Sequence, residues 1–187
     1  TEPQVASQVE GAASDEAPEI EEQVQALTNR IEITLFGRHA PDGQTCAAVH
    51  FGSAIPELVP IPRQGQNEFA TSRHPGLCGL EFAVESFGGP RYVSVVLDIS
   101  SGRFLETPPL PVGLNGNAPL RGRESWSVDI PYRMKRELEY RIVAIASESP
   151  SVDAAAWLSA QPDWEGAASE LSSRGHEIVW ATHRVIP

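Results

Sequence analysis

An alternation of apolar and polar side chains with a period of two residues recurs along most of the chain. A strand that buries one of its faces has this period. The alternation, or the dense β-branched composition of a fully buried strand, marks residues 30–36, 80–85, 91–99, 125–130, 138–147 and 176–186. Helical periodicity appears only within residues 152–175, where an Ala-rich run and a second segment after Pro162 predict two short helices.

The order of these segments predicts a mainly β chain, an antiparallel immunoglobulin-like β-sandwich with two short helices near the C-terminus. Strands do not alternate with helices, which argues against a doubly wound α/β fold. Turn residues at 38–44 predict a hairpin whose second strand is residues 45–51. The prolines in residues 108–111 cannot donate to a strand ladder, so the chain is expected to leave the sheet there. Residues 52–79, rich in Pro and Gly, are expected to form long loops.

The charge of the chain is unevenly distributed. The formal net charge is -11, and residues 1–22 contain acidic side chains but no Lys or Arg. This segment also lacks aromatic residues, so it cannot bury enough apolar surface to offset the entropy of ordering it. We therefore expect residues 1–26 to be a flexible acidic tail or linker. Residues 27–187 have the length of a single domain.

Composition excludes several classes of function. An acidic chain does not offer the cationic surface that nucleic-acid binding requires. No apolar run approaches the roughly 18 residues of a membrane-spanning helix. The glycine-rich phosphate-binding patterns are absent, so no cofactor is expected. No basic segment followed by an apolar segment marks a secretory signal. The compartment is left open, with the cytoplasm favoured over the periplasm or the extracellular space.

Two cysteines, Cys46 and Cys78, form the whole cysteine complement. A disulfide between them would close a loop long enough to stabilise the fold by about 3 to 4 kcal/mol. Free thiols in a reducing compartment are the alternative. The spacing does not decide between the two states.

The histidines do not predict a metal site. His176 and His183 are separated by an odd number of residues on one expected strand, so their rings point to opposite faces. Cys46 and His50 share a strand face, but four residues of strand place them roughly 13 Å apart, beyond a common coordination sphere. We expect no metal ligands.

Nucleophile motifs are also missing. No serine lies in a Gly-x-Ser-x-Gly elbow, and the one histidine near Cys78 is His74, in a segment that Pro75 marks as a turn. We therefore expect no catalytic residue and no enzymatic activity. A hydrolase with a Cys/His or Ser/His site is retained as an alternative.

Two features are candidates for binding a protein partner. Pro108 and Pro111 form a Pro-x-x-Pro pattern, whose polyproline helix can dock in an aromatic groove. Trp157 and Trp164 lie on the expected helices, where either indole can serve as an exposed anchor.

The segments YVSVVLDISSGRF, TPPLP, YRIVAIASESP and WATHRV occur in this order within residues 91–187. This order resembles an uncharacterised bacterial β-sandwich domain that recurs beside caspase-like peptidase and protein-kinase modules. The resemblance implies an accessory or sensing role next to such a protease or signalling component, and it transfers no catalytic residue.

Our leading hypothesis is a non-catalytic protein-interaction or regulatory domain that binds a protein partner. The binding surface would be a sheet edge or the irregular residues 52–79. The alternative is an extracytoplasmic domain that is stabilised by a disulfide between Cys46 and Cys78 and binds a small ligand or a cell-surface polymer.

Overall fold

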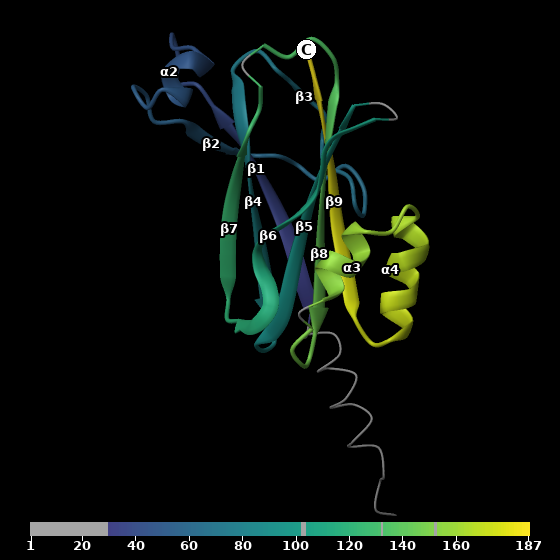
Figure 1. Cartoon of the computed structure of the whole chain (residues 1–187). Coiled ribbons are helices and arrows are strands. Elements are labelled where there is room, and N and C mark those ends of the chain that lie inside the picture. Colours follow the sequence, from purple (N-terminus) through teal and green to yellow (C-terminus); the bar gives the residue numbers. More distant parts are fainter. Residues whose placement is uncertain (1–29, 102–103, 132, 152) are drawn as a thin grey trace, which may run out of the picture.

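The computed structural model describes residues 30–101, 104–131, 133–151 and 153–187, with only the backbone of residues 104–114 (Figure 1). The predicted tail at residues 1–26 lies outside this part, and its boundary with residues 27–187 stays a prediction. In chain order the elements are β1 (Arg30–His39), α2 (Cys46–His50), β2 (Glu57–Pro60), β3 (Ser72–Arg73), β4 (Leu77–Phe87), β5 (Arg91–Ser101), β6 (Phe104–Leu120), β7 (Arg123–Asp129), β8 (Leu138–Ser147), α3 (Ala154–Ser159), α4 (Trp164–Ser173) and β9 (Glu177–Ile186).

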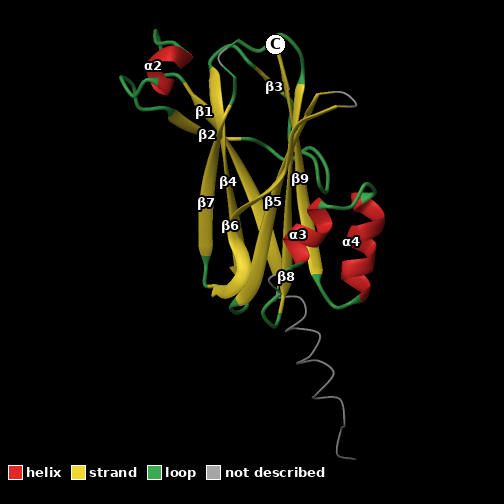
Figure 2. Ribbon diagram, in the orientation of Figure 1, coloured by secondary structure: helices red, strands yellow, loops and turns green. Residues whose placement is uncertain are grey.

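The strands form two sheets. One sheet has the order β2-β1-β4-β7 and the other has the order β3-β9-β8-β5-β6. The strands pair antiparallel, except that β3 pairs with β9 in parallel. Figure 2 shows that strands dominate, with α3 and α4 beside the second sheet and α2 at one end of the first. The prediction of a mainly β chain with two short helices near the C-terminus is confirmed.

The two sheets share one hydrophobic core. Alternate residues of β1 and β4 face alternate residues of β5, β8 and β9, as the two-residue period predicts. The fully buried members include Ile33, Leu80, Phe82, Val84, Val93, Val95, Ile142 and Ala181. Each large aliphatic side chain buried in this way stabilises the fold by roughly 1.5 to 3 kcal/mol.

A second cluster lies on the outer face of the five-stranded sheet. There Val96 and Val143 pack against Leu158 of α3 and Leu171 of α4. Strands β5 and β8 are consequently buried on both faces, which accounts for the nearly continuous apolar run in residues 138–147.

The expected hairpin strand at residues 45–51 is wrong, because Cys46–His50 is the short helix α2. Strand β1 already pairs with β4 on one edge and with β2 on the other, so it has no edge left for a strand that follows it directly. The two alanines of the segment also favour a helix.

The expected departure of the chain at residues 108–111 is also wrong. Strand β6 runs through these prolines and remains paired with β5. The pairing shifts register between Tyr92 and Ser94, between Ser94 and Val96, between Leu97 and Ile99 and between Ile99 and Ser100. Because β6 is the end strand of its sheet, a missing proline N–H can face outward without breaking the ladder.

Candidate functional site

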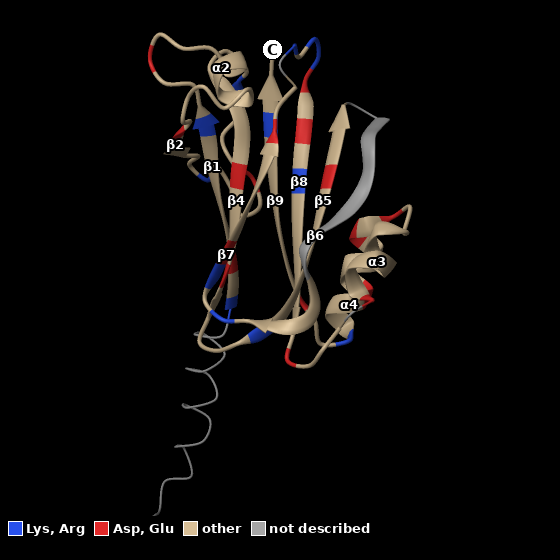
Figure 3. Ribbon diagram, turned by 60° about the vertical axis from the view of Figure 1, so that its left-hand side comes forward, with Lys and Arg blue, Asp and Glu red and all other residues tan. Residues whose placement is uncertain are grey.

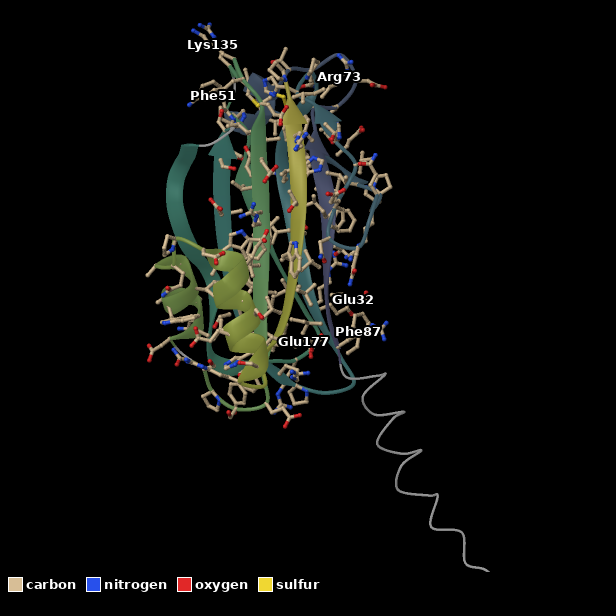
Figure 4. The ribbon with its side chains drawn as sticks, turned by 90° about the vertical axis from the view of Figure 1, so that its right-hand side faces the viewer. Glu32, Phe51, Arg73, Phe87, Lys135 and Glu177 are labelled. Carbon is tan, nitrogen blue, oxygen red and sulfur yellow. A yellow bond between two sulfur atoms is a disulfide. The ribbon has the colours of Figure 1, made fainter. Side chains whose placement is uncertain are left out.

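Four large apolar side chains are exposed at one end of the molecule. Phe51 and Ile55 are each 87% exposed, Leu58 is 49% exposed and Val59 is 45% exposed. They lie on the segment that contains the C-terminal end of α2, the following loop and β2, and we call these four residues the apical patch. In Figure 4 Phe51 lies at the same end as Lys135, far from Glu177. Exposed large apolar side chains that lie close together in the chain make this segment a candidate interaction surface.

The segment that bears Phe51 is held firmly to the core. A disulfide joins Cys46 of α2 to Cys78, which is buried in β4. The loop after α2 folds back on the helix, because the backbone N–H groups of Ser53 and Ala54 both donate to the Ala48 carbonyl, at 2.9 and 3.1 Å. The exposed side chains of the apical patch are therefore presented by a fixed backbone.

Strand β2 is the end strand of its sheet, and it carries the other half of the patch. Val59 pairs with Gly37 of β1, and Leu58 pairs with Arg38. The two side chains point to opposite faces, and both are about half exposed because β2 lies at the sheet margin. The outer edge of β2 has no partner strand among the described residues. A free strand edge of this kind can pair with another chain.

The remainder of β1 is protected along the same edge. The Ile61 N–H donates to the Leu35 carbonyl at 2.9 Å, and the Arg63 guanidinium donates to the Ile33 carbonyl at 2.7 Å. The Glu177 carboxylate accepts from the Ile31 N–H at 3.1 Å. Side chains and loop backbone thus cover β1 beyond the point where β2 ends, at Pro60 opposite Phe36, so on this side of the sheet the open edge is confined to β2.

Charged and ionisable groups border the patch. Arg38 forms an ion pair with Asp129 at 3.0 Å, and His50 lies 3.9 Å from the same carboxylate. Figure 3 shows α2 and the loop after it largely without charge, while the end of β1 is basic. An apolar centre with a polar border is typical of protein interfaces.

The two tryptophans proposed as partner anchors lie elsewhere. Trp157 on α3 and Trp164 on α4 are half-buried and pack against the outer cluster. The Arg174 guanidinium lies 5.6 Å from the Trp157 ring, and that of Arg141 lies 4.6 Å from the Trp164 ring. Their indoles therefore mainly fix the helices to the sheet.

Pro108 and Pro111 lie within β6, and Pro111 is opposite Val96 of β5. Their side chains lie outside the part that the structure describes. Because the segment pairs with β5, a separate polyproline helix is not its conformation here.

The described residues contain no cluster of three or more His, Cys, Asp or Glu side chains that could hold a metal ion. The histidines lie in different environments. His183 is completely buried, and burial lowers its pKa to about 4.

His176 lies next to Ser151, a neighbour that the sequence did not reveal. The Ser151 Oγ is 2.9 Å from His176 Nε2, and His176 Nδ1 is 3.2 Å from the Leu171 carbonyl. A carbonyl only accepts, so Nδ1 carries the proton and Nε2 of the neutral ring accepts from the serine hydroxyl. Ser151 does not cap α3, because that helix begins after Asp153.

Comparisons with protein-family models, curated protein sequences and solved structures found no match to this chain. No helix in the described ranges combines the length and the apolar character needed to cross a bilayer.

None of the four residues of the apical patch was predicted individually, although Ile55, Leu58 and Val59 lie within residues 52–79, a region that was expected to bind a partner. The sequence FGSAIPELVP contains a usable signal. It places four large apolar residues in a stretch whose Gly and Pro prevent a long strand or helix. Phe51 and Ile55 lie outside the helices and strands, and Leu58 and Val59 lie in a strand of only four residues, so none of them is carried into the core.

Proposed function

We propose that this chain is a non-catalytic protein-interaction domain, and that the apical patch docks an extended apolar segment of a partner protein. The observation that supports this most strongly is the 87% exposure of both Phe51 and Ile55 on a segment fixed by a disulfide. Both side chains are exposed to solvent, and neither contributes to the packing of the core.

An extended partner segment fits the patch better than a helix or a globular surface. The outer edge of β2 offers backbone N–H and C=O groups, and such edges bind by strand addition. Alternate side chains of an added strand would point to the two faces, where Leu58 and Val59 are half exposed. Phe51 and Ile55 would supply further apolar contact beside the added strand.

We propose an immunoglobulin-like arrangement of the two sheets, which the shared core and the antiparallel pairing support. The partner that the resemblance of residues 91–187 suggests is a caspase-like protease or another signalling component.

A peptide selection tests the proposal. Random peptides displayed on phage are selected on the oxidised wild-type protein, and binding of the enriched peptides is measured by fluorescence anisotropy. We expect enriched peptides with apolar residues at alternate positions. Replacement of Leu58 by Asp, or of Phe51 by Ser, should weaken their binding by about tenfold or more, equivalent to about 1.4 kcal/mol.

The matched control is Ser125→Asp on β7, the end strand at the other margin of the same sheet. It also adds a carboxylate to an exposed strand position, and it should leave peptide binding unchanged. Thermal unfolding of all three variants should stay close to wild type, because exposed substitutions usually change stability by about 0.5 kcal/mol or less. Peptides that bind Leu58→Asp as tightly as wild type would refute the proposed docking site.

A second candidate function is a serine hydrolase, favoured by the hydrogen bond between Ser151 and His176. In this arrangement the neutral imidazole can take the hydroxyl proton as Oγ attacks an ester carbonyl. A fluorophosphonate probe should then label Ser151, and His176→Ala should abolish the labelling. Absence of labelling on wild-type Ser151 by mass spectrometry would eliminate this candidate.

A further inference from the structure

A cavity of about 260 Å³ lies where the helical layer ends on the outer face of the five-stranded sheet. Its floor comes from β5 and β8, and its wall comes from the end of α3, the connector after it and the first residue of α4. The main lining residues are Val96, Asp98, Arg141, Val143, Leu158 and Trp164. The volume is slightly below the roughly 300 Å³ at which sites for drug-sized ligands begin, so the cavity suits one small ring.

Asp98 is the unusual group in this cavity. Its Oδ1 atom is buried and has no hydrogen-bond partner among the described residues. Burial raises the pKa of this carboxyl group, and the nearby Glu139 raises it further, while Arg141 opposes both effects. A buried acceptor without a donor destabilises a fold, so a ligand that donates a hydrogen bond to the Asp98 carboxylate would be stabilised in this cavity.

Arg141 supplies the complementary donors. It lies opposite Asp98 on the neighbouring strand, and its Nη1 is 3.7 Å from Asp98 Oδ2, which is longer than a hydrogen bond. Its Nη2 is 3.4 Å from Glu139 Oε1. Of these charged groups only Asp98 and Arg141 line the cavity, and their opposite charges leave its lining without a net charge to attract an ion.

The cavity wall is rigid and apolar. The Trp164 ring is held edge-on against Trp180 at a centroid distance of 5.6 Å, and the Arg141 guanidinium lies over its face. Val96 and Leu158 complete the apolar lining. A ligand must therefore place an apolar face against this wall while its polar atoms reach Asp98 and Arg141.

We propose that this cavity binds a single neutral sugar residue, free or at the end of a polymer. Adjacent hydroxyls of a pyranose ring can donate to the Asp98 carboxylate and accept from Arg141, because each hydroxyl is both a donor and an acceptor. The C–H faces of the ring match the apolar wall. A small zwitterion such as an amino acid is the less favoured occupant, because the charges of Asp98 and Arg141 already balance each other. This site is independent of the apical patch.

Saturation-transfer NMR tests the proposal with D-glucose, D-galactose, D-mannose and N-acetyl-D-glucosamine at millimolar concentration. At least one sugar should receive saturation from wild-type protein. Asp98→Asn keeps the shape of the side chain and replaces a carboxylate oxygen by an amide, and it should weaken binding by about tenfold. Asp98→Leu should abolish binding.

Glu165→Ala on α4 is the control, since this exposed carboxylate does not line the cavity, and it should bind like wild type. Thermal unfolding establishes that each variant is folded before binding is measured. The proposal is overturned if none of the four sugars receives saturation, if both Asp98 variants bind like wild type, or if L-valine binds at this site and the sugars do not.

Discussion

Acidification from pH 6.5 to pH 4 should lower the free energy of unfolding by about 3 kcal/mol through His183 alone. This histidine is fully buried in the core, opposite Tyr140 on the neighbouring strand. Both ring nitrogens lack a hydrogen-bond partner in the part of the chain that is described. Burial therefore lowers the pKa of His183 to about 4, from an ordinary value of 6.5.

The free energy of unfolding falls on acidification because the unfolded chain binds one proton more than the folded chain does. Above pH 6.5 the ring is neutral in the folded and the unfolded chain. Between pH 6.5 and about 4 the unfolded chain binds a proton that the folded chain does not bind, so the unfolded state is favoured as the pH falls. Below pH 4 both states are protonated and the loss is complete. Burial raises the pKa of the adjacent Tyr140 to about 12, so its phenol stays neutral throughout this range.

Urea unfolding of wild type and His183→Leu at a series of pH values measures this effect. The variant retains the carboxylates, so the difference between the two curves isolates the histidine. Between pH 6.5 and pH 4 the free energy of unfolding should fall less steeply for the variant than for wild type. The two slopes should differ by up to about 1.4 kcal/mol per pH unit. At pH 7 the variant should be the more stable protein, because the unpaired ring nitrogens are gone. Parallel curves for the two proteins would show that His183 is not buried as described.

Reduction of the disulfide should lower the free energy of unfolding by about 3 to 4 kcal/mol. The bond closes a loop across a sequence separation of 32 residues between Cys46 and Cys78. Opening it increases the conformational freedom of the unfolded chain, and it also releases α2 from β4. Peptide binding at the apical patch should weaken as well, because Phe51 follows α2 directly.

Chemical denaturation of the same protein with and without a reducing agent gives this difference without a change of sequence. The double replacement of Cys46 and Cys78 by Ala is the second measurement, and it should be destabilised in both conditions. A change below about 1 kcal/mol on reduction would mean that the two thiols are not joined in the folded protein.

The main strands could be predicted because their alternation reflects burial on one face. Strand β8 has its predicted bounds, β5 ends two residues later than predicted, and β1 begins at its predicted residue but ends three residues later, at His39. The segment at 45–51 was wrongly predicted as a strand, because its conformation depends on the occupation of both edges of β1 by the later strands β2 and β4. Strand β6 was missed for a similar reason, because prolines are compatible with a strand only when it is the end strand of its sheet.

The site was less predictable than the fold. Exposure of Phe51 and Ile55 is a property of the tertiary structure, and the same residues in another context would be core. The approach of Ser151 to His176 spans 25 residues and depends on how α3 and α4 pack on the sheet. Likewise the Asp98 and Arg141 pair depends on the register of β5 with β8.

Hydrogen exchange of β2 in the presence of an enriched peptide tests the docking proposal most directly. We expect slower exchange of the backbone amide of Leu58 when peptide is bound, because its N–H faces outward from β2, whereas the Val59 N–H already points toward β1. Exchange in β7, at the opposite margin of the sheet, should be unchanged. Protection confined to β7, or peptide binding without any protection in β2, would contradict the account.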